Sequence, residues 1–327
     1  MTATIANRKT WIDWAKAIGI LLVVMGHSNY SQPDINPMIF MIHMPLFFVV
    51  SGYLFKTNRD LKAITQSNIK SLLIPYILFN AIWMLYILSS SIVKLALGAD
   101  PEWPSYLDIY KTAVGIPGNL FCGTSWFLLA LIWCKYIIYA IEKGMLWVKI
   151  GVVTLWIISF VLIQIYKPES PLCFNAGIAG CLWFGIGFYI KKYSEKIHVS
   201  KWLWAIAIPF AFMGCLYVCR AQGNCNYLAG NVKGFLGLAG TAAGLISFFG
   251  VCVLLDKFNS KLIMRVSSAS IAIMCLHMMI MINLQKAIHY QYHLCVTLLG
   301  DIVIVLILTT IFPLMQKYTP WLIGNRK

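Results

Sequence analysis

The fold is decided near the N-terminus by the stretch Trp11-Ile-Asp13-Trp-Ala-Lys16-Ala-Ile-Gly-Ile-Leu-Leu-Val-Val-Met-Gly-His27-Ser28. It is apolar enough for a membrane helix, yet it carries an acid, a base and an imidazole. It has no small-residue cleavage site, so we expect it to be retained as the first helix. A bilayer core of ~30 Å needs about 20 apolar residues per helix, and comparable stretches follow almost to the end of the chain. The sequence therefore predicts an all-α integral membrane protein.

Composition supports this class. The 327 residues are 60% hydrophobic and only 11% charged, whereas soluble domains carry about 25% charged residues. The net charge of +15 does not indicate nucleic acid, because the basic residues form short runs between apolar segments. We expect one membrane domain over residues 1–327, with the helical bundle at 10–316 and a short cytoplasmic tail at 317–327.

Hydropathy predicts ten membrane helices and one shorter element. The odd segment is 106–121, which carries charges and glycines around a proline and is interpreted as re-entrant or interfacial. The ten helices are predicted at about 11–30, 38–55, 71–93, 126–141, 148–166, 175–190, 202–219, 234–255, 268–285 and 295–316.

The basic residues also predict the orientation. If the N-terminus is cytoplasmic, the inner segments hold eighteen Lys and Arg residues and the outer segments six, with Lys16 and Lys135 inside helices. This alternation follows the positive-inside rule. It places both termini and the Lys191 to Lys196 loop inside, and Asn226 and His289 outside.

The polar residues of the first helix share one face. At ~100° per residue, Lys16 and His27 differ by only about 20° after three turns, and ~16 Å of helix separates them. Asp13 lies about 40° from the same direction. The lysine is therefore expected near the cytoplasmic mouth and the histidine near the opposite side. The structural alternative is that Lys16 snorkels to the headgroups and His27 caps the helix.

The second predicted helix returns from the outer side with His43-Met-Pro-Leu-Phe-Phe-Val-Val-Ser51-Gly52-Tyr53. Its first histidine starts at the depth where His27 ends, and imidazoles that titrate near neutrality suit acid–base or nucleophilic work. A purely structural His43 is the alternative. Gly52 with Ser51 favours close helix approach, and Pro45 is expected near the helix start, where it disturbs little hydrogen bonding.

These residues resemble the acyltransferase-3 family of membrane acyltransferases, whose signature is a basic residue and a histidine separated by ten intervening positions in helix 1. Lys16 and His27 match it, with lysine where many members have arginine, and the His43 to Tyr53 run matches a second motif. Weaker matches extend the resemblance over nearly the whole chain: Lys70 to Tyr76, Ser125 to Leu128, Trp183 to Gly187, and Ser267 to His277.

The resemblance implies an acyl-CoA, most simply acetyl-CoA, on the cytoplasmic side and a glycan hydroxyl, in a cell-envelope or lipid-linked sugar, on the other. A cation near the inner mouth suits coenzyme A phosphates and an imidazole ~16 Å further out suits the thioester. His27 is then a general base or a transient acyl carrier, with His43 beside it, and Asp13 orients Lys16. The location implied is a bacterial inner membrane.

Further candidates carry alternatives. Lys70 and Arg59 are candidates for holding coenzyme A phosphates, or are simple topology signals. Trp126 and Ser51 are candidate acceptor-binding residues, Trp126 alternatively belonging to the interfacial aromatic belt. His277 is a core histidine or a catalytic one, whereas the remaining candidates, His198, His289 and His293, are expected in loops.

The sequence also bears on metal sites, disulfides, partners and alternative functions. No metal is expected, because no helix shows paired ligand spacing. Most of the ten cysteines are expected to be small core residues, with one disulfide among Cys173, Cys219 and Cys225 left open. Membrane lipids and a second copy of the chain are expected partners, and nucleic acid is not. A proton-coupled transporter or flippase, and a non-enzymatic assembly partner, are the alternative functions.

Overall fold

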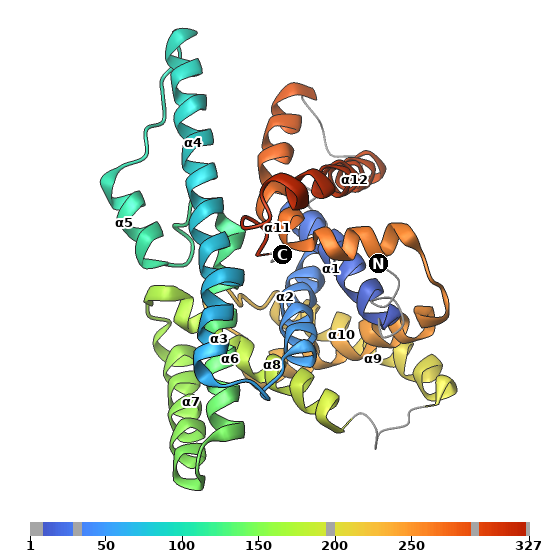
Figure 1. Ribbon diagram of the computed structural model, residues 1–327. Coiled ribbons are helices and arrows are strands. Elements are labelled where there is room, and N and C mark those ends of the chain that lie inside the picture. Colours follow the sequence, from blue (N-terminus) through green and yellow to red (C-terminus); the bar gives the residue numbers. More distant parts are fainter. Residues whose placement is uncertain (1–8, 29–34, 194–199, 289–293, 325–327) are drawn as a thin grey trace. The chain divides into compact units, whose positions relative to one another are not determined.

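The computed structural model describes residues 9–28, 35–193, 200–288 and 294–324. These residues form helices and contain no strand, which confirms the all-α prediction (Figure 1). The helices are α1 Thr10–His27, α2 Ile35–Leu54, α3 Leu61–Asn68, α4 Ile74–Ala96, α5 Tyr106–Val114, α6 Trp126–Lys143, α7 Leu146–Tyr166, α8 Phe174–Tyr193, α9 Lys201–Gln222, α10 Gly234–Leu254, α11 Lys261–Ile288 and α12 Leu294–Tyr318. Short helical turns η1 Ile69–Leu73, η2 Gly123–Ser125, η3 Pro171–Cys173 and η4 Leu255–Lys257 join some of them.

Within the described ranges, nine helical segments are long and apolar enough to cross a membrane. The chain is therefore a multi-pass membrane protein. The helix α1 is not among these nine, and its 18 residues include Asp13, Lys16 and His27. The helix α5 has nine residues and is about 14 Å long, too short to span, as expected for 106–121. The count of ten spans and the orientation stay predictions.

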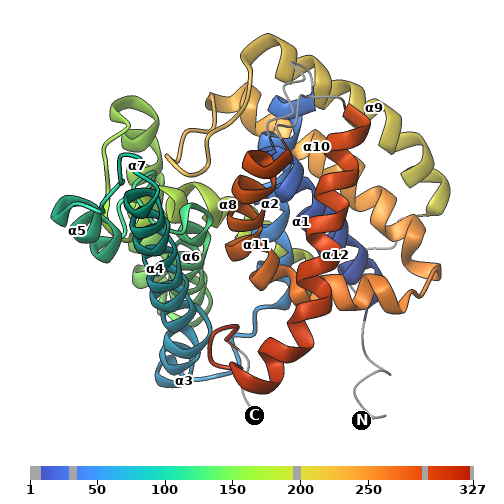
Figure 2. The same cartoon turned by 90° about the horizontal axis from the view of Figure 1, so that it is seen from above.

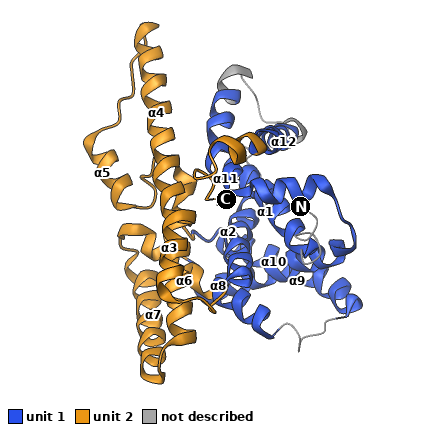
Figure 3. Cartoon of the chain, viewed as in Figure 1, with its two compact units in different colours: residues 1–55, 183–226, 232–312 blue, residues 56–182, 227–231, 313–327 orange. Residues whose placement is uncertain are grey.

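The chain forms two compact units, coloured in Figure 3. Unit 1 comprises Met1–Phe55, Trp183–Asn226 and Val232–Phe312, and unit 2 comprises Lys56–Leu182, Tyr227–Asn231 and Pro313–Lys327.

In unit 1 the helix α1 packs against α2, α10 and α11, and α9 packs along α10 (Figures 1 and 2). The first turn of α1 is fixed by η4, because the backbone N–H of Trp11 donates to Asp256 Oδ1 at 2.7 Å. A helix start leaves N–H groups unpaired and favours negative charge, so a carboxylate there stabilises the helix. The indole N–H of Trp14 donates to the carbonyl of Phe258 at 2.9 Å and adds a second anchor.

A close helix crossing in unit 1 depends on two glycines. A Cβ on Gly52 of α2 would lie 1.9 Å from the carbonyl oxygen of Phe184 in α8. A Cβ on Gly187 of α8 would lie 2.0 Å from the carbonyl oxygen of Val49. Only glycine allows backbones to approach this closely. The predicted close approach at Ser51-Gly52 is confirmed, and its partner is the Trp183 to Gly187 stretch of α8.

The expectation for Pro45 was wrong. The helix α2 begins at Ile35 rather than at 38, so this proline is the eleventh of its 20 residues and lies inside the helix. A proline has no N–H to give to the carbonyl four residues earlier, which here belongs to Met41. The interior proline therefore removes one helical hydrogen bond close to His43.

In unit 2 the helices α3 and α4 are continuous through η1, forming a 36-residue segment, Leu61–Ala96. This segment is longer than the predicted 71–93 and measures about 54 Å. The residues Ile69–Leu73 of η1 are π-helical, and Pro75 follows directly. Because proline cannot donate to the carbonyl of Ser71, the wider turn before it absorbs the missing bond.

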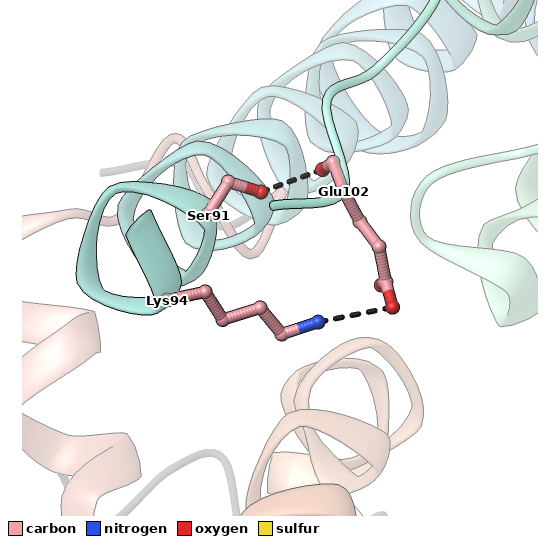
Figure 4. A network of polar contacts seen from close by, with 3 residues as sticks. All are labelled: Ser91, Lys94 and Glu102. Atoms are coloured by element: carbon pink, nitrogen blue, oxygen red, sulfur yellow. Dashed lines mark hydrogen bonds and ion pairs between the residues drawn. The ribbon is translucent and has the colours of Figure 1, made fainter. Parts of the chain in front are cut away.

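Polar contacts fix the loops of unit 2 to α4. Asn80 Nδ2 donates to Ser125 Oγ at 3.0 Å, and the backbone N–H of Cys122 donates to Asn80 Oδ1 at 2.9 Å. At the other end of α4, Ser91 Oγ donates to the carbonyl of Glu102 at 2.6 Å. Lys94 and Glu102 form an ion pair at 2.9 Å (Figure 4). This pair is partly solvent-exposed, so it contributes little stability.

The cysteines are buried thiols. The nine cysteines whose side chains the structure describes are free and buried. The three cysteines considered for a disulfide make other contacts instead. Cys173 Sγ lies 3.4 Å from the carbonyl of Gly115, Cys225 Sγ 3.3 Å from that of Val232, and Cys219 Sγ 3.6 Å from Met41 Sδ. These thiols act as small core side chains.

Candidate active site

Three histidines from three helices of unit 1 form a cluster. His27 ends α1, His43 lies in α2 and His277 lies in α11. The rings of His27 and His277 have centroids 5.3 Å apart. The ring of Phe40 lies edge-on to the rings of His27 and His43, with centroid distances of 6.1 Å and 5.2 Å. Ring contacts therefore connect His27 directly to His277 and, through Phe40, to His43.

Hydrogen bonds fix the tautomers of the two buried members. His43 Nδ1 lies 2.6 Å from the carbonyl oxygen of Ile39, and His277 Nδ1 lies 2.9 Å from the carbonyls of Ile273 and Met274. A carbonyl only accepts, so Nδ1 carries the proton in each ring. An uncompensated imidazolium is costly in apolar surroundings. Both rings are therefore assigned as neutral, with a lone pair on Nε2.

This lone pair has no partner in His277. The side chain is 0% exposed, and its Nε2 makes no hydrogen bond. An unsatisfied buried acceptor costs about 1–3 kcal/mol, and such groups in native proteins call for an explanation such as a catalytic role. From the sequence, His277 could be either a core histidine or a catalytic one. In the structure it lies beside His27, and its Nε2 is an unused proton acceptor.

A carboxyl group that the sequence analysis missed lies next to the cluster. Asp301 of α12 lies beside Ser28, the residue that follows His27. Asp301 is 2% exposed and its Oδ2 has no partner. The segment 295–316 was interpreted only as an apolar span. An acid within such a span is by itself a functional signal, and Asp301 could have been found that way.

The opposite end of α1 carries Asp13 and Lys16, the residues predicted to bind the acyl-CoA donor. Asp13 is buried, and its Oδ1 accepts a hydrogen bond from Ser267 Oγ in α11 at 2.6 Å. Lys16 is half-buried. Because α1 is one uninterrupted helix, Lys16 and His27 are separated by about 16 Å along it. The predicted spacing from cation to imidazole is therefore present.

Tyr53 closes the same end of α2 onto the start of α1. Lys9 Nζ donates to its hydroxyl at 2.7 Å, and the Trp11 ring lies edge-on to it with centroids 5.0 Å apart. Lys191 of α8 lies 5.5 Å above the same ring. The last residue of the His43 to Tyr53 motif is therefore structural. Ser51 is half-buried, and its predicted acceptor contact stays a prediction.

The remaining predicted residues belong to unit 2. Arg59 precedes α3 and Lys70 lies in η1, and both are exposed. Trp126 starts α6, is 7% exposed and meets Phe127 edge-on with centroids 6.0 Å apart. Their phosphate and acceptor roles stay predictions.

Two further points concern the rest of the chain. The three loop histidines, His198, His289 and His293, lie outside the described residues. Across the described ranges, no three His, Cys, Asp or Glu side chains gather in a metal-binding arrangement.

Comparisons with known proteins identify the family of the chain. The sequence model of the acyltransferase-3 family, described as an acyltransferase domain, matches residues 9–315. Over 228 residues the chain is 28% identical to nodulation protein NolL of Mesorhizobium japonicum, covering 64% of this chain and 56% of that protein. The chain thus spans about half the length of this relative. No solved structure matches. The family match includes every helix that carries the histidine cluster, and the chain belongs to the acyltransferase-3 family.

Proposed function

We propose that the chain is a membrane acyltransferase. It would move an acyl group, which we take to be acetyl, from cytoplasmic acyl-CoA to a hydroxyl of a cell-envelope or exported glycan. The family match supports acyl transfer. The observation that carries the proposal is the placement of His27. It lies at the opposite end of α1 from Lys16, and its ring centroid is 5.3 Å from that of His277. We place the protein in a bacterial inner membrane. Family membership does not favour a transporter or flippase.

On the donor side, Lys16 would bind a phosphate of coenzyme A, and a charged hydrogen bond of this kind is worth about 1.5–3 kcal/mol. Asp13, fixed by Ser267, would hold local charge balance when the site is empty. The pantetheine arm would follow α1 outward and bring the thioester to His27. Lys70 and Arg59 are further candidates for phosphate contacts within unit 2.

At the outer end, His27 would take the proton of the acceptor hydroxyl while the hydroxyl oxygen attacks the thioester carbonyl. The tetrahedral intermediate would then collapse with cleavage of the carbon–sulfur bond. The departing thiolate would receive the proton from His27, which returns to its starting state. His43 and His277, both held as Nδ1–H tautomers, would orient protons through their Nε2 lone pairs.

A covalent route uses the same residues. His27 would attack the thioester first, release coenzyme A and carry the acyl group on its ring until the acceptor hydroxyl removes it. The two routes differ in whether a modified protein forms when the acceptor is withheld. The peptide that contains Gly26, His27 and Ser28 would gain the acyl mass only in the covalent route.

The decisive experiment uses purified protein in vesicles with radiolabelled acetyl-CoA and extracted glycolipids. We expect label in a glycolipid with the wild type and no product with His27→Ala, since loss of a general base costs 10²–10⁴-fold in rate. The variant should still bind acyl-CoA, because the proposed phosphate contacts lie a helix length away. Near-normal turnover of His27→Ala would refute the site.

A further inference from the structure

Unit 2 contains a cation inside a membrane-spanning segment. Lys135 lies midway along α6, within the span Gly123–Lys143, where a charged side chain is costly and usually functional. Its Nζ donates to Asn68 Oδ1 at 3.2 Å, and Asn68 is a neutral residue. In the part of the chain that the structure describes, no carboxylate pairs with Lys135. The acyl-transfer proposal assigns it no role.

The partner of this lysine is itself incomplete. Asn68 is 2% exposed, and its Nδ2 makes no hydrogen bond. An ammonium group can only donate, so the amide oxygen must face Lys135. The amide nitrogen is therefore left as an unpaired donor beside a cation that retains two further N–H groups. All the unused polar atoms at this place are donors.

The surroundings hold these donors in position. Tyr136, the next residue of α6, donates from its hydroxyl to Thr65 Oγ1 in α3 at 2.9 Å, which fixes the two helices at this level. The π-helical residues Ile69–Leu73 directly follow Asn68, and π-helical turns occur frequently at functional sites. The same turn carries the exposed Lys70, which adds positive charge.

Snorkelling is the ordinary explanation for a lysine in a membrane helix. It would extend the side chain along lipid and place the ammonium among headgroups. Here the ammonium is instead bonded to an asparagine that is almost fully buried. Lys135 is only half-buried, so part of it can still be reached. Snorkelling does not account for the contact with Asn68 or for its unpaired amide.

We propose that Lys135, positioned by Asn68, binds a phosphate group. Phosphate supplies several acceptor oxygens and negative charge, and lysine binds it as a point charge. The phosphate would belong either to coenzyme A or to the headgroup of an anionic phospholipid. The site stands on unit 2 alone, so it does not depend on acyl transfer.

The test compares four forms of the full chain in phosphatidylcholine nanodiscs. Lys135→Gln removes the cation, and Asn68→Asp keeps the lysine but gives it an internal counter-charge of the same shape. Lys94→Gln is the matched control, because this lysine of unit 2 already has an acidic partner, Glu102. One arm measures binding of coenzyme A and of 3′-dephospho-coenzyme A by calorimetry. The other arm counts retained phosphatidylglycerol by native mass spectrometry.

We expect Lys135→Gln and Asn68→Asp to lower the binding of either coenzyme A or phosphatidylglycerol at least tenfold, while the control Lys94→Gln binds both as the wild type does. Loss in the first arm assigns the phosphate to coenzyme A, and loss in the second arm assigns it to lipid. Unchanged binding in both arms overturns the proposal. If Lys135→Gln does not fold, Asn68→Asp decides alone. A wild type that binds no coenzyme A would remove the donor of the proposed function, and the lipid arm would still decide this site.

Discussion

The unpaired Nε2 of His277 predicts that this histidine reduces stability and serves activity. We consider His277→Leu, which removes both ring nitrogens at nearly constant volume. Loss of the buried orphan acceptor should return about 1–3 kcal/mol, and loss of the Nδ1–H bond should cost about 0.5–1.5 kcal/mol. The carbonyls of Ile273 and Met274 lie inside α11 and retain their helical hydrogen bonds. The variant should therefore lie between about 0.5 kcal/mol less stable and about 2.5 kcal/mol more stable than the wild type, with a net gain of about 1 kcal/mol at the centre of the range.

Turnover should move in the opposite direction. If the Nε2 lone pair orients a proton next to His27, its loss removes about one hydrogen bond from the transition state, or roughly 1.4 kcal/mol and a tenfold rate. His277→Asn separates the two nitrogens, because its amide N–H can replace Nδ1–H while nothing replaces Nε2. Both variants should therefore be about tenfold slower.

The chain offers a convenient assay for the stability half. The nine described cysteines are buried, so a thiol-reactive fluorophore reports unfolding on heating. Turnover is followed with radiolabelled acetyl-CoA in the same vesicles. Wild-type turnover in both variants would refute the reasoning and leave His277 as a core residue. A Leu variant that unfolds earlier than the Asn variant would show that the Nδ1–H bond, rather than Nε2, is what matters.

Three more predictions test the packing, the donor site and the topology. Gly187→Ala should lower the free energy of unfolding by about 1–3 kcal/mol or more, because the new Cβ would lie 2.0 Å from a carbonyl oxygen. In the control Gly151→Ala, the new Cβ meets nothing within 4 Å, and the variant should gain about 0.5–1 kcal/mol from helix propensity. Equal thermal midpoints of the two variants would contradict this. Lys16→Ala should weaken acyl-CoA binding at least tenfold in calorimetry and Lys16→Arg should preserve it; unchanged affinity in the alanine variant would remove its phosphate role. Asn226 is exposed beside the buried Cys225, so Asn226→Cys should be labelled only from outside sealed vesicles; labelling from the cytoplasmic side would reverse the orientation.

The sequence was sufficient for the helices and for the first half of the site. Membrane helices need long apolar runs, so their existence can be predicted from composition alone. The 3.6-residue period placed Lys16 and His27 on one face, and a regular helix α1 preserves that spacing. Helix ends were less predictable. The helix continues from Leu61 through Ala96, because a π-helical turn accommodates Pro75, whereas the sequence predicted a helix that begins only at 71.

The rest of the site depends on contacts between distant segments. His277 is 250 residues from His27 in the sequence, and no local pattern brings α1 and α11 together. Asp301 could have been noticed as an acid within an apolar span, but a single acid hardly changes the mean hydropathy of that 22-residue segment. Its burial and unpaired Oδ2 become visible only when neighbouring helices are in place.

The motif from His43 to Tyr53 shows how chemistry and architecture share one helix. Gly52 fixes the position of α2 against α8 through backbone contact, and Tyr53 joins α2 to the start of α1. His43 lies nine residues before Gly52, about 14 Å along the helix, at the level of Phe40 and the histidine cluster. The crossing therefore sets the depth and rotation of His43 without touching the histidine cluster. A motif that resembles a catalytic signature is, for most of its length, the support that holds one imidazole in place.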